Sequence, residues 1–346
     1  MSNAASQNTD LTTIDDHHHV KPIKGQLLLQ ANATISCQLD GKGKTHPITS
    51  HTEATTKNPC WLHLDFSDPK TIDWINHTTL IPDLAKKELL KPNQSPKEIR
   101  FDSGILIVLK GVNFTPNTLP DPIVTFRFYI TDNLIISTRR QHIEAIVSLK
   151  DKFEKGIGPV DVADWLIQVV ELISDQVNQS FDSVYNVIAK YEDKVFKRKE
   201  FARRDIGHIH KQLIILRRLL VPQRDILVRV AAERISWIDN QDRQLLQNIS
   251  IQQSHYIDDI DGCLNRLSAL LDLINNIIAE STNKRIYLMT IFTIIFTPIT
   301  FITSLLGVNL AGIPFSSHEW SFTGIVLIIL IVCIGSVVWL KFKKWL

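Results

Sequence analysis

The chain has 346 residues, and its 38 lysines and arginines nearly balance its 36 aspartates and glutamates, which leaves a formal net charge of +2. This balance excludes a strong overall field of the kind that attracts nucleic acid or a highly charged substrate. The mean hydropathy of +0.02 is ordinary for a soluble protein, but it averages a polar body with two intensely apolar segments near the carboxyl end.

The amino-terminal region gives no sign of secretion. Its first apolar run, at residues 27–29, is too short for a signal peptide. Residues 1–24 are polar and contain three consecutive histidines, and this composition predicts a disordered tail. The cysteines show no paired spacing, so we expect reduced thiols in a cytosolic setting rather than disulfides. They are Cys37, Cys60, Cys263 and Cys333.

Residues 25–158 alternate β-rich runs with helical patterns, which predicts a cytosolic α/β domain with a mixed sheet of undetermined strand order. Helices are expected at Pro69–Thr78 and Pro82–Leu90, because each segment begins with a proline near its first turn. Residues 131–133 predict a hairpin turn between two strands. The expected strands are Gln26–Gln38, Cys60–Phe66, Ile99–Val108, Ile123–Ile130 and Leu134–Thr138.

Long helices are predicted from there to the apolar segments. Residues 159–238 repeat apolar side chains at steps of three and four, which predicts a helical hairpin with a kink at Pro222. Residues 239–285 predict a stalk helix, in which Ile257, Ile260 and Leu264 begin a spacing typical of a coiled-coil seam. No proline or glycine follows Cys263 before the first apolar segment, so the stalk is expected to run directly into it.

Residues 286–308 and 322–340 are long and apolar enough to cross a bilayer, whose core needs roughly 20 helical residues. Lysines and arginines lie just before the first segment and in the basic tail 341–346, whereas the loop 309–321 has only His318 and Glu319 as ionisable groups. The positive-inside rule therefore places both termini and the large domain in the cytosol, with the loop on the periplasmic side.

The first span carries a stripe of hydroxyl side chains on one helical face. A ring of identical helices that turn this stripe to a shared axis would form a narrow wet pathway, and two spans alone cannot enclose one. Hydrogen bonding between packed helices is the alternative use of such hydroxyls. Neither span contains Asp, Glu, His, Lys or Arg, so selectivity is expected from hydroxyls, carbonyls and amides. The stripe consists of Thr290, Thr293, Thr297, Thr300 and Ser304.

Residues 290–309, with their Pro-x-Thr-Phe-Ile core and terminal Gly307-Val308-Asn309, resemble the CorA superfamily of divalent-cation transporters. The basic tail and the order of the elements are similar to that family as well. The magnesium-transporting branch has Gly-Met-Asn and a Met-Pro-Glu loop, whereas this chain has Val308 and a Gly-Ile-Pro loop at 312–314, which resembles the ZntB branch associated with zinc. The resemblance implies a funnel-shaped homopentamer in the bacterial cytoplasmic (inner) membrane, with proton-coupled uptake proposed for that branch.

The resemblance also implies roles for individual residues. Gly307, Val308 and Asn309 would form the selectivity filter, with the Asn309 amides meeting the hydrated cation. The hydroxyl stripe would line the route inward to Asn283 at the cytosolic mouth. Met289 would act as an apolar gate by dewetting, with ordinary packing as the alternative.

Three further sets of side chains have a spacing that suits contact with a metal ion. His318 and Glu319 would concentrate cations at the entrance, an effect that salt screens. His255, Asp258 and Asp259 have helical spacing that suits a cytosolic metal site between subunits, although a solvated stalk face is the favoured interpretation. Cys60 and His63 have ligand-like spacing, but in a strand they point to opposite faces.

The sequence thus predicts an α+β membrane protein that transports divalent metal cations, with Zn²⁺ uptake favoured and Co²⁺, Ni²⁺, Cd²⁺ and Mg²⁺ as further candidates. A Mg²⁺/Co²⁺ channel and a membrane-anchored metal sensor or scaffold are the alternatives. No catalytic or phosphate-binding motif is present, so neither an enzyme nor a bound cofactor is expected, and the metal ion is cargo. A nucleic-acid partner is not expected.

Overall fold

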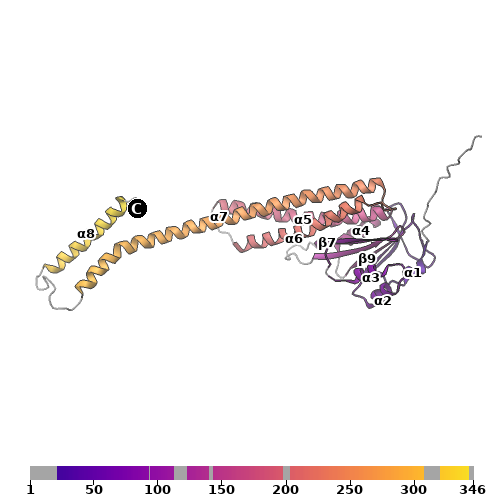
Figure 1. The fold of residues 1–346 in the computed structure, drawn as a ribbon, viewed down its shortest axis with the longest axis horizontal. Helices are drawn as coiled ribbons and strands as arrows, with labels where there is room; N and C mark the ends of the chain where they lie inside the picture. The colour runs from indigo at the N-terminus through magenta and orange to yellow at the C-terminus, as the bar shows by residue number, and fades with distance from the viewer. Residues whose placement is uncertain are drawn as a thin grey trace, which may run out of the picture. The chain divides into compact units, whose positions relative to one another are not determined.

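The computed structural model describes residues 22–92, 94–112, 123–139, 143–197, 203–307 and 320–342, so the predicted disordered tail lies almost entirely outside them. The chain falls into two compact units, Met1–Leu267 and Ser268–Leu346. The first unit contains a sheet with helices on both of its faces, and the second contains the apolar helices (Figure 1).

The main sheet has seven strands in the order β3-β2-β5-β9-β8-β7-β6. Only β5 and β9 run parallel, with Cys60 opposite Leu134, and every other neighbouring pair is antiparallel. The sheet is therefore mixed, as predicted. Its strands are β2 (Ile35–Leu39), β3 (Thr45–Pro47), β5 (Cys60–Asp65), β6 (Lys97–Phe101), β7 (Gly104–Val112), β8 (Ile123–Ile130) and β9 (Leu134–Arg139). Two short strands, β1 (Ile23–Lys24) and β4 (Glu53–Ala54), pair separately.

Helices cover both faces of the sheet. One face packs against α1 (Gly25–Leu29), α2 (Pro69–His77) and α3 (Asp83–Leu90), and the other packs against α4 (Glu144–Glu154), α5 (Val162–Phe196) and α6 (Arg203–Ala232). Aromatic rings anchor α5 to the second face. The Trp165 ring lies 5.5 Å from the Trp61 ring and 5.3 Å from the Phe128 ring, and all three side chains are buried.

The helix starts agree with their sequence signals. Asp68 accepts a hydrogen bond from the Lys70 N–H at the start of α2, and Pro69 occupies the first turn. Asp161 does the same for the Asp164 N–H at the start of α5. The predicted turn between β8 and β9 is confirmed, with the Thr131 N–H donating to the Leu134 carbonyl.

Two strand predictions are wrong. Residues 26–38 are not one strand, because α1 ends at Leu29 and the chain reverses through Asn32, whose φ of 48° lies in the left-handed region. Residues 99–108 are not one strand either, because they form the hairpin of β6 and β7. Gly104 fits there because a Cβ would come within 2.3 Å of the Ile130 carbonyl oxygen. The sequence patterns also missed α4.

His63 is buried in the sheet, and its Nδ1 lies 2.8 Å from the Ser137 hydroxyl, which also accepts a hydrogen bond from the Trp61 indole. Burial, together with the nearby positive charge of Arg139, lowers the pKa of His63 to about 3. Cys60 belongs to the core of the opposite face. The strand-packing interpretation of these two residues is therefore confirmed.

α7 is a single helix from Asn240 to Leu306 that begins in the first unit and ends in the second, and Pro298 lies inside it. In the first unit, the predicted seam is buried at Ile257, Ile260 and Leu267. Ion pairs join this part of α7 to its neighbours: Arg217 of α6 to Asp261, and Arg266 to Glu192 of α5. α8 (Ser321–Phe342) completes the second unit.

Candidate ion pathway

α7 and α8 each contain a stretch long and apolar enough to cross a membrane, with mean hydropathies of 1.9 and 2.8. Almost nothing in either stretch is buried, which distinguishes them from the core helices of a soluble protein. The flanking charges are partly paired, since Lys284 lies 2.9 Å from the Glu280 carboxylate.

The hydroxyl stripe lies on an exposed face of α7. Thr290, Thr293, Thr297, Thr300 and Ser304 are all exposed, whereas a set of apolar positions on the other side of the helix is half-buried. The stripe is therefore not packed against any of the residues that the structure describes. The half-buried positions are Ile291, Ile294, Ile295, Pro298, Ile299 and Ile302.

The threonine hydroxyls direct their protons into their own helix. Thr290, Thr293 and Thr300 donate to the carbonyls four residues earlier, each at 2.9 Å. Each oxygen then keeps lone pairs for partners outside the helix. Water bound to a cation presents its hydrogens outward, so a surface of acceptor oxygens suits a hydrated cation.

Thr297 differs from these three threonines. Among the residues that the structure describes, its hydroxyl has no hydrogen-bond partner. It is followed by Pro298, which has no backbone N–H and leaves the Ile294 carbonyl without its helical donor. The Thr297 hydroxyl and the Ile294 carbonyl therefore both lack a hydrogen bond within α7, and they lie within one turn of each other.

Two residues before the hydroxyl stripe extend the exposed face toward the first unit along α7. Asn283 is exposed and Met289 is 71% exposed, so both are accessible on the helix surface. The sequence patterns missed Ile286, which is 55% exposed, lies four residues before Thr290 and provides the carbonyl that Thr290 bonds. Its position four residues before Thr290 places it on the same helical face, but an apolar side chain does not belong to a pattern of hydroxyls.

The outer residues are only partly described. The Gly307 N–H donates to the Thr303 carbonyl at 2.9 Å and so continues the helical bonding. The φ of Gly307 lies outside the left-handed region that glycine often adopts at a helix end. Val308, Asn309, His318 and Glu319 lie outside the described residues.

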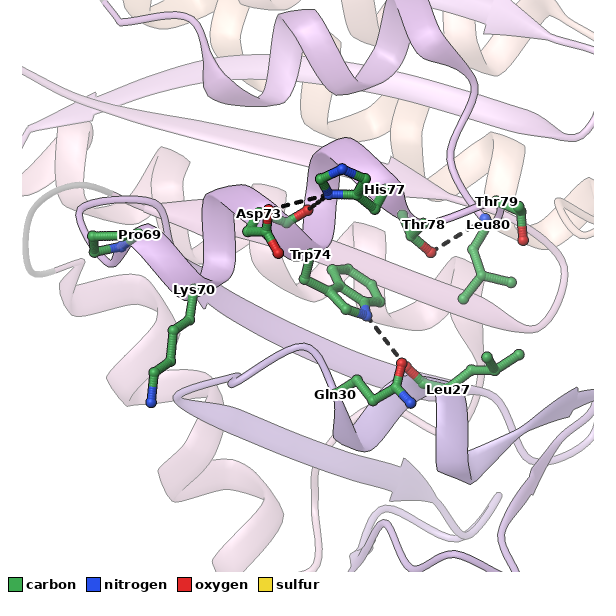
Figure 2. Close-up of a pocket in the computed structure, with 10 residues that line it drawn as sticks. All are labelled: Leu27, Gln30, Pro69, Lys70, Asp73, Trp74, His77, Thr78, Thr79 and Leu80. Atoms are coloured by element: carbon green, nitrogen blue, oxygen red, sulfur yellow. Dashed lines mark hydrogen bonds and ion pairs between the residues drawn. The ribbon is translucent and has the colours of Figure 1, made fainter.

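The first unit has a hollow of about 750 Å³ on α2, with Trp74 near its centre (Figure 2). At its rim, His77 Nδ1 lies 3.2 Å from the Asp73 carboxylate and 2.9 Å from the Asp73 carbonyl. Within the described parts of the chain, no three His, Cys, Asp or Glu side chains gather as a metal centre. His255, Asp258 and Asp259 thus form no such centre within one chain, and a site between subunits stays a prediction.

Comparison with known proteins agrees with this arrangement. The family described as CorA-like Mg²⁺ transporter protein matches residues 56–344. The chain belongs to the CorA-like family. A relative in that family, the zinc transport protein ZntB of Yersinia enterocolitica, is 36% identical over 324 residues, which cover 94% of this chain and 99% of the relative.

Solved structures show the same CorA-like fold. The full-length CmaX protein matches with a TM-score of 0.77 and 24% identity, covering 90% of this chain and 97% of that protein. The CorA magnesium transporter from Methanocaldococcus jannaschii matches with a TM-score of 0.76 and 18% identity, covering 90% and 99%. At these identities the structures establish the fold, and they do not indicate which ion the chain transports.

Proposed function

We propose that the chain transports divalent metal cations across the bacterial inner membrane through a homopentameric pore, with Zn²⁺ as the main cargo. The exposed hydroxyl stripe on α7 is the observation that carries the proposal, because a helix that only anchors a sensor would not need it. The curated relatives named zinc transport protein support zinc as the cargo.

In this proposal the hydroxyl oxygens of Thr290, Thr293, Thr297, Thr300 and Ser304 face the shared axis and accept hydrogen bonds from the water around the cation. Asn309 provides the outer amide ring, Met289 and Ile286 provide the apolar inner constriction, and Asn283 marks the cytosolic mouth. His318 and Glu319 attract cations to the entrance. Both termini face the cytosol, as the flanking lysines and arginines favour.

The driving force comes from ion gradients or the membrane potential. Moving a doubly charged ion inward across about 100 mV is favourable by roughly 4–5 kcal/mol. The spans hold no Asp, Glu, His, Lys or Arg, so any coupling to protons runs through pore water or through His318 and Glu319.

Uptake into proteoliposomes tests the proposal, with Zn²⁺ and Mg²⁺ compared in the presence and absence of an inward proton gradient. Saturable zinc uptake by wild-type vesicles is the expected result. In Asn309→Ala vesicles we expect uptake to lose its selectivity for zinc over magnesium, with assembly size unchanged by light scattering. Zinc uptake that rises with the proton gradient supports coupling. Absence of flux for either metal removes the transport proposal in favour of a membrane-anchored sensor.

A Mg²⁺ channel is the second candidate, favoured by the description of the matching family. Val308 stands where the magnesium-transporting branch has methionine, which favours zinc. Magnesium flux that exceeds zinc flux and ignores the pH gradient would reverse this order.

A further inference from the structure

The side of α5 that faces away from its buried residues carries a row of carboxylates, which we call the acidic face. Its members follow one another at steps of seven, four and seven residues, which places them along one line of the helix. Burial raises the pKa of Glu171, the charge of Lys152 opposes this rise, and the charges of Asp175 and Asp164 add to it. The carboxylates are therefore close enough to repel one another. The acidic face consists of Asp164, Glu171, Asp175 and Asp182.

α5 and its neighbours do not neutralise the acidic face. Within the described residues, the exposed carboxylates of Glu171, Asp175 and Asp182 form no hydrogen bond and no ion pair. Lys152 is near, but its Nζ donates to the Gln168 side-chain oxygen at 3.2 Å. The acidic face thus keeps its charge within one chain.

α6 carries the opposite charge on the side that faces away from its own buried residues. Lys211 and Arg218 lie seven residues apart there, and both are exposed. Neither forms an ion pair within the described residues. Arg218 lines a hollow of about 680 Å³ with Asp261, but the two oxygens of that carboxylate bind Arg217 at 2.6 and 3.2 Å. We call Lys211 and Arg218 the basic face.

Two contacts fix the height of α6 along α5. Near the turn between the two helices, the Tyr191 hydroxyl donates to the Asp205 carboxylate at 2.6 Å. Near the sheet, a Cβ on Gly111 would lie 3.6 Å from the Ile173 side chain of α5, and Gln223 of α6 donates to the carbonyl of the preceding residue at 2.7 Å. Both contacts give the same antiparallel register, so that one step forward along α5 corresponds to one step backward along α6.

This register places the basic face at the height of the acidic face. Arg218, five residues before Gln223, is level with residue 178, between Asp175 and Asp182. Lys211 is level with residue 185, three residues beyond Asp182. Three residues of helix rise only about 4.5 Å, which a lysine or arginine side chain spans. Copies in a closed ring are related by rotation about one axis, so helices that run along the axis keep their heights from copy to copy.

We propose that the acidic face of α5 binds the basic face of α6 in a neighbouring copy of this chain, with Arg218 between Asp175 and Asp182 and Lys211 beside Asp182. The inference rests on the homopentamer of the proposed function and gives it a contact in the first unit. Because the two faces differ, the contact is heterologous, and its repetition about an axis closes a ring. Complementary charges of this kind select the partner and its register more than they add affinity.

Cross-linking of the full-length protein in detergent tests the contact. Asp182→Cys and Lys211→Cys are made in separate chains that carry different epitope tags, so that no link can form within one chain. The two variants are expressed together and treated with a short bis-maleimide. We expect a covalent dimer that contains both tags. Each variant expressed alone is a control that keeps the native cysteines, and it gives no dimer because a heterologous contact brings unlike residues together.

Reversal of charge tests whether the ion pairs hold the contact. Arg218→Asp in both chains is expected to lower the yield of the mixed dimer by about two- to fivefold. Addition of Asp175→Arg exchanges the charges across the contact and restores the yield. Lys190→Asp is the matched control, because it reverses the charge of an exposed lysine of α5 outside the acidic face. The yield in this control is expected to equal that of the parent pair.

Three results overturn the proposal. They are an oligomer in light scattering that gives no mixed dimer, dimers from either variant alone, and a yield that Asp175→Arg fails to restore. The first result places the contact between copies elsewhere and leaves the homopentamer in place. A monomer in light scattering removes the homopentamer and this contact together. The readout needs no metal transport, so it is independent of the cargo.

Discussion

Thr297→Val gives the sharpest test of the hydroxyl stripe. Valine keeps the shape of threonine and removes only its hydroxyl, which has no hydrogen-bond partner among the described residues. The change therefore breaks no bond within α7, and we expect the free energy of unfolding to stay within about 0.5 kcal/mol of wild type. Any large effect on transport must come from the lost contact with pore water.

The magnitude follows from the loss of hydrogen bonds to the ion's water shell. In a pentamer the substitution removes one full ring of hydroxyls, and each lost bond is worth roughly 0.5–1.5 kcal/mol. A passing hydrated ion engages one or two members of the ring at a time, so the barrier rises by about 1–3 kcal/mol. The transport rate is then expected to fall by about 5- to 150-fold.

The assay is initial zinc uptake into proteoliposomes at matched protein density, with Thr303→Val as the control. Thr303 is also exposed, but it lies beside the stripe, and its hydroxyl donates to the carbonyls of Ile299 and Thr300. Transport by the control is expected within about twofold of wild type. Equal rates for Thr297→Val and wild type would refute the pore-lining role and favour packing between helices.

Three further results are expected. Asn309→Ala is expected to abolish zinc selectivity over magnesium in uptake competition while the oligomer stays intact, because the Asn309 amides are the first groups to meet the cation in the proposed pore. Trp165→Ala is expected to lower the free energy of unfolding by about 3–5 kcal/mol in urea titration, since it empties the centre of the aromatic cluster. His63→Gln is expected to flatten the acid dependence of stability. The pKa of His63 is about 3 in the folded protein and has its ordinary value of 6.5 in the unfolded chain. The contribution of His63 to stability is therefore complete above pH 6.5, and it falls as the pH drops toward 3, by up to about 1.4 kcal/mol per pH unit.

Each expectation has an opposing result. Unchanged selectivity in Asn309→Ala would remove the filter assignment. A loss below about 1 kcal/mol in Trp165→Ala would mean that the site collapses around the missing ring. Parallel stability curves for His63→Gln and wild type between pH 5 and 7 would show that His63 titrates normally.

Long-range periodicity predicted the helical half of the molecule well. The apolar steps of three and four predicted α5, α6 and α7, because one buried stripe per helix is enough to reveal such elements. Short elements near the amino terminus were harder to predict. Leu27 to Leu29 form an apolar run too short to show a helical period, whereas the structure makes this segment part of a five-residue helix that buries Leu28.

The exposed hydroxyl face of α7 could be predicted from the sequence, whereas the strand order of the sheet could not. Hydroxyls at helical spacing in an apolar span define a face without knowledge of the fold, whereas strand order depends on contacts between distant residues. The buried contact between His63 and Ser137 shows that limit clearly. The two residues belong to different strands, and no spacing in the chain joins them.

The parallel pairing of β5 with β9 has a consequence for biosynthesis. These central strands lie about 70 residues apart, so the sheet cannot close until β9 has left the ribosome. The first apolar stretch follows roughly 150 residues later, which at 5–20 residues per second takes about 7–30 s. The sheet therefore has time to close before the first apolar stretch leaves the ribosome, and a nascent chain arrested before that stretch is expected to carry a protease-resistant domain.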